Sequence, residues 1–237
     1  MVKRPETLPD NTSPGNTGKT EVDAFLAKLQ ATPPVAKGRG RLIFAMDATA
    51  SREPSWAQAC QIQNEMFTAT AALGGLEVQL VFYRGFDECK ASAWLSSADA
   101  LVRRMMAVRC LGGQTQLGKV LGHAIRETTK AKVGALVFVG DCMEEDVDAV
   151  CARAGELGLL GVPAFMFHEG HDPVAARAFQ QIAKLTGGVY CRFDSSSAEQ
   201  LKRLLGAVAA YVAGGALALE DYGRRTGVTL QLTGRRP

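Results

Sequence analysis

Residues 42–51 read Leu-Ile-Phe-Ala-Met-Asp-Ala-Thr-Ala-Ser (LIFAMDATAS), an apolar run that ends in an acid and two hydroxyl side chains. A short apolar run of this kind predicts a buried strand, as in a parallel sheet covered on both faces. Asp47, Thr49 and Ser51 follow at alternate positions, where the predicted strand ends. This stretch therefore predicts the first strand of an α/β fold and a row of oxygen-bearing side chains at the rim of its core.

The rest of residues 41–213 alternates between predicted strands and predicted helices. We expect strands at 42–46, 77–83, 88–95, 133–139, 162–167 and 189–193. We expect helices at 55–73, 98–108, 117–130, 145–157, 173–185 and 198–212. The turn before 88–95 is short enough to make a hairpin, so that strand is antiparallel to the one before it. The order predicts a doubly wound, mostly parallel six-stranded sheet with one antiparallel edge strand and helices on both faces.

The segments outside this domain differ from it in composition. Residues 1–20 are rich in Pro, Asn, Thr and Gly and are predicted to be disordered. Residues 21–40 are predicted to form a short helix, 21–31, and a linker, and we expect that helix to dock on its own domain. Residues 214–237 form a C-terminal extension in which the alternating Val228, Leu230 and Leu232 are compatible with a short strand.

Charge and composition limit the classes of partner that we expect. Hydrophobic residues make up 47% of the 237 residues and the formal net charge is +3. Residues 1–40 and 214–237 each carry a net +2, which leaves −1 for 41–213 and argues against a nucleic-acid partner for the domain. We found no apolar run of membrane-spanning length and no secretory signal, so we expect a cytoplasmic protein without a membrane partner. The six cysteines are then expected to be reduced.

Following the chain through the predicted sheet brings three segments to one end of it. They are residues 47–51 after the first strand, 113–115 before the helix 117–130, and 140–141 after the strand 133–139. Right-handed crossovers place the strand 42–46 beside the strand 133–139, with later strands on one side and earlier strands on the other. This is the topological switch point, where open α/β sheets bind ligands.

The side chains expected at this crevice share one chemistry, because all of them offer oxygen. They are Asp47, Thr49, Ser51, Thr115 and Asp141. Carboxylate and hydroxyl oxygens suit hard divalent cations, so we predict a Mg²⁺ site, with Mn²⁺ and Ca²⁺ as alternatives. Two carboxylates and three hydroxyls leave room for one more anionic oxygen from outside. Arg52, Arg84 and Arg109 are expected at the rim of the same end, where they would attract an acidic partner.

This constellation resembles the von Willebrand factor type A (VWA) domain and its metal-ion-dependent adhesion site (MIDAS). The family motif is Asp-x-Ser-x-Ser after the first strand, a Thr in a later loop and an Asp after the fourth strand; Thr49 departs from it by adding a methyl group. The resemblance covers about 40–213 and is closest to stand-alone bacterial members. It implies that Thr49, Ser51 and Thr115 touch the metal directly, with Asp47 and Asp141 acting directly or through water.

The function that we expect is a non-catalytic, metal-dependent protein-binding module that grips a carboxylate of a partner protein. One alternative is a phosphoryl-transfer hydrolase with Asp47 as its nucleophile, although Thr49 stands where such phosphatases place a second Asp. Another is a structural or assembly protein with an empty metal site, whose N-terminal helix makes the contact. Each segment also has a simpler interpretation, since Asp47, Ser51 and Thr115 are common helix-capping types.

Two further clusters favour simpler interpretations. The acidic run at Glu144, Glu145, Asp146 and Asp148 is expected to favour the start of a helix through the helix dipole. His168 and His171 invite a metal interpretation, but their spacing is loose and no third ligand is near in the sequence. We therefore expect them to belong to a loop.

Overall fold

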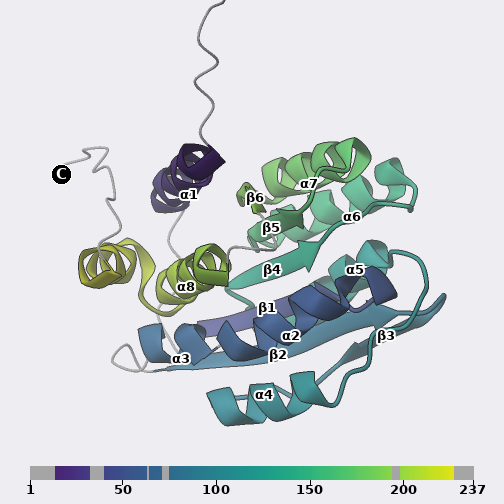
Figure 1. Ribbon diagram of the computed structural model, residues 1–237, viewed down its shortest axis with the longest axis horizontal. Coiled ribbons are helices and arrows are strands. Elements are labelled where there is room, and N and C mark those ends of the chain that lie inside the picture. The colour runs from purple at the N-terminus through teal and green to yellow at the C-terminus, as the bar shows by residue number, and fades with distance from the viewer. Residues whose placement is uncertain (1–13, 33–39, 63, 71–74, 194–197, 227–237) are drawn as a thin grey trace, which may run out of the picture.

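A computed structural model describes residues 14–32, 40–62, 64–70, 75–193 and 198–226. These residues form a six-stranded sheet in the order β3-β2-β1-β4-β5-β6 (Figure 1). The strands are β1 Gly40–Asp47, β2 Leu76–Arg84, β3 Glu88–Ala91, β4 Ala135–Gly140, β5 Ala164–Glu169 and β6 Tyr190–Phe193. β2 and β3 pair antiparallel, whereas the other four neighbouring pairs are parallel. The predicted fold class and strand order are confirmed.

Helices cover both faces of the sheet, as the continuous apolar strands require. They are α1 Pro14–Ala31, η1 Ala50–Arg52, α2 Glu53–Ile62, α3 Asn64–Thr70, α4 Ala98–Met106, α5 Leu117–Lys130, α6 Val147–Leu159, α7 Pro173–Thr186 and α8 Ala198–Thr226. Leu42, Phe44 and Met46 of β1 face a core shared with α1, α2, α3, α4 and α8. Ile43 and Ala45 face the opposite core, built with α5, α6 and α7.

Several element bounds differ from the prediction. The segment predicted as one helix at 55–73 is divided between α2 and α3, with η1 directly before α2, and residues 63 and 71–74 lie outside the described part. The predicted strand at 88–95 ends at Ala91 and then makes a single bridge between Leu95 and Val78. α5 has the predicted bounds, because its apolar positions recur at helical spacing over its whole length.

The N-terminal helix α1 begins at Pro14, inside the segment 1–20 that was predicted to be disordered. Proline loses no hydrogen bond in the first turn of a helix, and extending a docked helix costs little once its nucleus has formed. Phe25, Leu26 and Leu29 are buried, and the Phe25 ring lies 5.4 Å from that of Phe167 in β5. The helix therefore docks on its own domain, as expected. Residues 1–13 lie outside the described part.

The C-terminal helix α8 is longer than expected, because it continues past the predicted boundary at residue 213 to Thr226, with a kink at Gly215. The alternation at 228–232 lies outside the described residues. Contrary to our expectation, one helix, Glu199–Thr226, is long and apolar enough to cross a membrane. Within the domain, however, 61% of that window is buried, because Leu204, Leu205 and Val208 pack into the core. A core helix passes the same test, so its composition is weak support for a membrane span.

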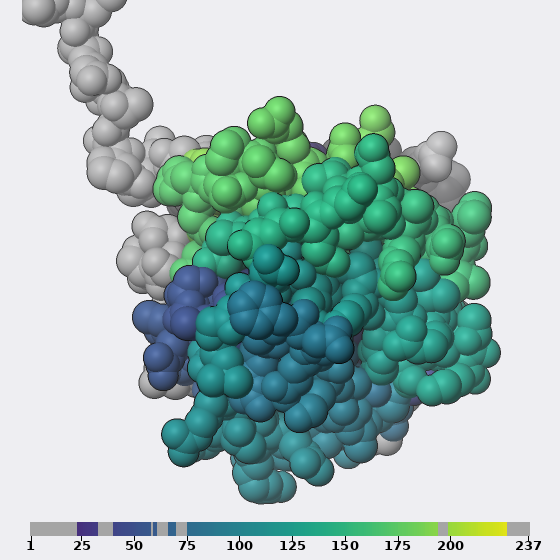
Figure 2. All heavy atoms as spheres, turned by 90° about the vertical axis from the view of Figure 1, so that its right-hand side faces the viewer, coloured from purple at the N-terminus to yellow at the C-terminus, as the bar shows by residue number. Residues whose placement is uncertain are grey.

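The carboxyl end of the sheet gathers loops that are far apart in the sequence. The Ala48 amide donates to the Tyr83 carbonyl at 2.9 Å, and the Leu111 amide donates to the Ala48 carbonyl at 3.1 Å. These bonds tie the segment after β1 to the end of β2 and to the loop before α5. The arrowhead of β4 points to the right in Figure 1, and Figure 2 turns that side toward the viewer.

Candidate metal site at the carboxyl end of the sheet

Asp47 ends β1 with its side chain almost fully enclosed, at 1% exposure. Its Oδ1 accepts a hydrogen bond of 2.7 Å from the Thr49 amide, which folds the chain back over the carboxylate. Burial raises the pKa of Asp47, the negative charge of Asp141 adds to the rise, and the Thr49 hydrogen bond opposes it. A nearby cation would therefore stabilise the charged form of this carboxylate.

Hydroxyl groups connect the end of β1 to the end of β4. The Thr49 and Ser51 side-chain oxygens lie 3.3 Å apart, and Ser51 Oγ donates to Asp141 Oδ2 at 3.0 Å. Thr49 is 8% exposed, whereas Ser51 is exposed. Four of the five residues predicted as metal ligands are thus joined by a continuous series of short contacts.

The second carboxylate contributes an oxygen without a protein partner. Asp141 Oδ1 is buried and accepts no hydrogen bond from the described residues. A buried carboxylate oxygen without a hydrogen-bond donor is energetically unfavourable, and a bound cation would provide the missing partner. No group of three or more His, Cys, Asp or Glu side chains in the described part is arranged to hold a metal. The predicted set has only two carboxylates, so hydroxyl oxygens would have to supply the other protein ligands, which suits Mg²⁺.

Thr115 lies in the loop before α5 and is 5% exposed. Its hydroxyl accepts from the Glu144 amide at 2.9 Å, and its own amide donates to Glu144 Oε2 at 3.0 Å. This reciprocal pair fixes the loop before α5 against the loop after β4, in which Asp141 lies. The contacts of Thr115 are with Glu144, whereas the other four predicted ligands contact one another.

The acidic side chains that follow Asp141 mainly accept hydrogen bonds from backbone amides at the starts of helices. This is the simpler of the two interpretations. Glu145 accepts hydrogen bonds from the Leu117 amide and, at 3.0 Å, from the Gly118 amide, both at the start of α5. Asp146 is the N-cap of α6 and accepts from the Asp148 and Ala149 amides at 2.9 and 3.1 Å. These carboxylates meet amide donors that the first turn of each helix leaves unpaired.

Arg52 does not line the surface rim as predicted, because it is 1% exposed. Its Nη1 forms an ion pair with Glu169 at the end of β5, and Ser55 Oγ donates to the other Glu169 oxygen at 2.6 Å. A buried guanidinium needs such a counter-charge. Sequence spacing gave no signal of this pair, since its members lie 117 residues apart.

The other two predicted rim arginines differ in how free they are. Arg84 forms a bidentate pair with Glu88, at 2.8 and 2.9 Å, and also donates to the Arg109 carbonyl at 2.7 Å. The Arg109 side chain is exposed. Of the two, Arg109 is the better placed to meet a partner, because the charge of Arg84 is already neutralised.

Two buried residues near the crevice were not predicted as part of it. Tyr83 pairs with Asp47 across the sheet, and burial, together with the Asp47 charge, raises the pKa of its hydroxyl well above its usual range. His168 and Glu169 are the last residues of β5 rather than part of a loop. His168 is fully buried, and its Nδ1 lies 2.9 Å from the Tyr190 hydroxyl. A tyrosine at the end of an apolar strand carries no distinguishing sequence signal.

No protein-family model matches the sequence, and no curated protein matches it. Solved structures match its fold. Proximal thread matrix protein 1 from the mussel byssus is 17% identical with a TM-score of 0.58, over 75% of this chain and 49% of that one. The SpRpn10 VWA domain is 12% identical with a TM-score of 0.54, over 73% of this chain and 95% of that one.

The vWF domain of the type V pili tip protein Mfa5 from Porphyromonas gingivalis is also similar. It is 9% identical with a TM-score of 0.54, over 85% of this chain and 99% of that one. The chain thus spans nearly the whole of two isolated VWA domains and about half the length of the mussel protein. At these identities the likeness establishes a VWA-like, doubly wound α/β fold and leaves the function to be argued from the site.

Proposed function

We propose that this protein is a non-catalytic binding module that holds Mg²⁺ at the carboxyl end of its sheet and grips a carboxylate of a partner protein. The observation that carries the proposal is the contact of 3.0 Å between Ser51 Oγ and Asp141 Oδ2. It joins the oxygen-bearing segment after β1 to a carboxylate whose other oxygen has no partner among the described residues.

In this proposal Asp47, Thr49, Ser51 and Asp141 hold the ion, and Thr115 contributes from the loop before α5. The oxygen-only donor set favours Mg²⁺, with Mn²⁺ or Ca²⁺ as alternatives. Bound Mg²⁺ would supply a Lewis-acidic position that accepts an anionic oxygen from outside. The protein's own part is to fix the two carboxylates and the hydroxyls, and the exposed Arg109 would attract the acidic partner.

One comparison supports the biological setting of the proposal. The Mfa5 domain, which has a similar fold, belongs to a pili tip protein, and a role in contact with other proteins is consistent with that setting. We also propose a cytoplasmic location, in which the cysteines would stay reduced.

The test is a Mg²⁺ titration followed by thermal unfolding, comparing the wild type with Asp47→Ala. A ligand that binds only the folded state stabilises it by about 2.7 kcal/mol at a hundred times its Kd. We expect the unfolding midpoint of the wild type to rise with Mg²⁺ and that of Asp47→Ala to stay flat. Asp99→Ala, which removes an exposed carboxylate from α4, is the matched control and should respond like the wild type.

An equal Mg²⁺ response in Asp47→Ala would contradict the metal site. If that variant does not fold, Ser51→Ala replaces it, because Ser51 is exposed and its loss leaves no buried cavity. A partner isolated with the wild type should dissociate in EDTA, and a partner that stays bound would contradict the metal-mediated grip. Phosphatase turnover that is lost in Asp47→Asn would favour the hydrolase instead.

A further inference from the structure

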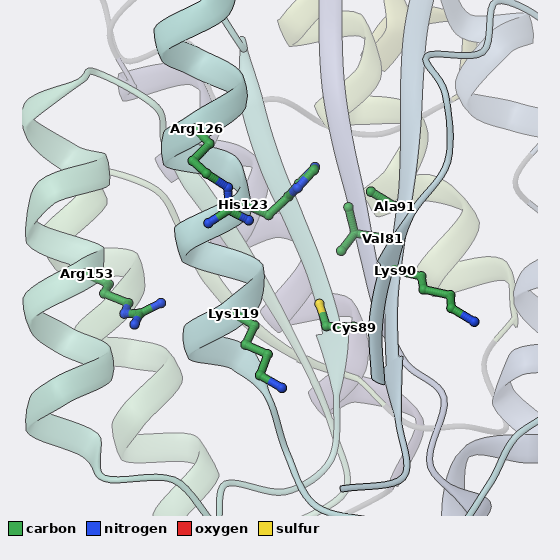
Figure 3. A pocket seen from close by; sticks show the side chains of 8 residues that line it. All are labelled: Val81, Cys89, Lys90, Ala91, Lys119, His123, Arg126 and Arg153. Carbon is green, nitrogen blue, oxygen red and sulfur yellow. The ribbon is translucent and has the colours of Figure 1, made fainter. Parts of the chain in front are cut away.

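A second polar pocket lies apart from the candidate metal site, between α5, α6 and the edge of the sheet. Its volume is about 170 Å³ (Figure 3). It is lined by Val81, Cys89, Lys90, Ala91, Lys119, His123, Arg126 and Arg153. Four of these eight side chains are cationic and none is acidic, although the domain as a whole has almost no net charge.

The positive charge arises from the helix periodicity of α5. Lys119, His123 and Arg126 recur at spacings of four and three residues and so share one face of the helix. Arg153 reaches this face from α6, where its Nη1 donates to the Gly118 carbonyl at 2.7 Å. In Figure 3 the Arg126 side chain lies along α5, and the Arg153 side chain extends toward α5 from the neighbouring helix.

Gly122 allows the two guanidinium groups to approach each other. A β carbon on this residue would lie 2.8 Å from Arg153 Nη1 and 3.5 Å from Arg126 Nη1. Both groups therefore lie over the same bare turn of α5. Among the described residues, neither guanidinium has a carboxylate within 4.0 Å.

Each of the two lysines of the pocket contacts a carboxylate. Lys119 is ion-paired with Asp87, and Lys90 lies 2.7 Å from Glu88 and points away from α5 (Figure 3). An adjoining pocket between α5 and α6 is lined by Glu145, Asp146 and Arg153 itself, but neither carboxylate forms an ion pair with Arg153, and both accept hydrogen bonds from backbone amides. Arg126 and Arg153 are thus the two cations of this pocket that have no carboxylate within 4.0 Å among the described residues, and an anion between them would relieve their mutual repulsion.

We propose that this pocket binds the phosphoryl group of a phosphate monoester between Arg126 and Arg153. Guanidinium groups present paired N–H donors whose geometry matches phosphate oxygens. Pockets for drug-sized ligands measure about 300–1,000 Å³, so a cavity of about 170 Å³ accommodates one phosphoryl group and a small substituent. Val81 and Ala91 provide an apolar wall for that substituent. This site is independent of the metal site.

The test is calorimetric titration with inorganic phosphate in EDTA at constant ionic strength, which keeps the metal site out of the measurement. We expect the double variant Arg126→Gln/Arg153→Gln to bind phosphate at least tenfold more weakly than the wild type. Arg103→Gln/Arg104→Gln removes the same charge from the exposed side of α4 and should bind like the wild type. Equal affinity in all three proteins would overturn the proposal.

Circular dichroism checks that the double variant is folded. If it is not, Arg126→Gln alone keeps the test decisive, because Arg126 is exposed and has no carboxylate partner among the described residues. Titrations with glycerol phosphate and with a phosphoserine peptide then distinguish a small-molecule source from a protein source. Tighter binding of either ester than of inorganic phosphate supports the site, whereas failure of both esters to bind overturns it.

Discussion

Thr49 is the residue at which the chain departs from the Asp-x-Ser-x-Ser pattern. The threonine keeps the hydroxyl and adds a methyl group, and its oxygen lies 3.3 Å from that of Ser51. With 8% exposure, the side chain is held in place by its surroundings. The extra methyl therefore leaves the hydroxyl facing the other oxygen-bearing side chains, which is the arrangement that metal binding would need.

Substitutions at Thr49 separate the hydroxyl from the methyl. We expect Thr49→Ser to keep the Mg²⁺-dependent rise in the unfolding midpoint, because the oxygen remains. Thr49→Val has nearly the same shape but lacks the oxygen, and we expect it to bind Mg²⁺ about tenfold more weakly, a loss of about 1.4 kcal/mol. Thermal unfolding over a Mg²⁺ series measures both. Wild-type binding by Thr49→Val would remove Thr49 from the ligand set.

At the scale of elements, α1 is an integral part of one core. The Phe25 ring lies 6.1 Å from Phe165 and 5.4 Å from Phe167, both in β5, and is 1% exposed. Replacing a buried Phe by Ala costs about 3–5 kcal/mol, from lost burial and from the cavity left behind. We expect Phe25→Ala to lower the free energy of unfolding by that amount in urea titrations.

The matched control is Leu159→Ala, because Leu159 in α6 is 91% exposed. It should change the free energy of unfolding by less than about 0.5 kcal/mol. A loss below 1 kcal/mol for Phe25→Ala would show that α1 contributes little to the fold in solution. The helix would then be free to contact a partner, as in the structural alternative.

His123 links α5 to β2, and its burial leads us to expect that the stability of the fold depends on pH. Its Nε2 lies 2.7 Å from Gln79 Oε1, and Gln79 Nε2 donates to the Ser92 carbonyl at 3.0 Å. Burial lowers the pKa of His123 below its ordinary value of 6.5, so the folded state favours the neutral ring. The contribution of His123 to the free energy of unfolding is therefore fully present above pH 6.5. It is lost as the pH falls below 6.5 and through the lowered pKa of the folded state.

We therefore expect the urea midpoint of the wild type to fall between pH 7.5 and pH 5.5. His123→Gln keeps a hydrogen-bond donor for Gln79 but does not titrate, so its midpoint should fall by less. Burial also lowers the pKa of His168, which acts in the same direction in both proteins and cancels in the comparison. Equal falls would mean that His123 is protonated as readily in the folded state as in the unfolded state.

At the scale of the whole molecule, the features that could be predicted from the sequence are those that depend on hydrophobic periodicity and on how the strands are connected. The hairpin before β3 and the right-handed crossovers were sufficient to derive the strand order. Contacts between distant elements could not be derived in this way. The pairing of Arg52 with Glu169 and the continuation of α8 past Gly215 both depend on which surfaces meet after folding. For this reason the rim position of Arg52 and the end of the last helix near residue 212 were predicted wrongly.

A further contact between distant elements joins the loop that holds Thr115 to the hairpin between β2 and β3 through their backbones. The Gln114 amide donates to the Gly85 carbonyl at 3.1 Å, and a β carbon on Gly113 would lie only 2.0 Å from that oxygen.

Gly113→Ala must therefore push the loop that holds Thr115 away from the hairpin between β2 and β3. We expect it to lower the free energy of unfolding by about 1–3 kcal/mol and to weaken Mg²⁺ binding. Gly112→Ala is the control, since a β carbon there would lie more than 4 Å from every described residue other than its two chain neighbours. Thermal unfolding with and without Mg²⁺ compares the two variants, and equal behaviour would show that the close approach of these loops does not hold the site together.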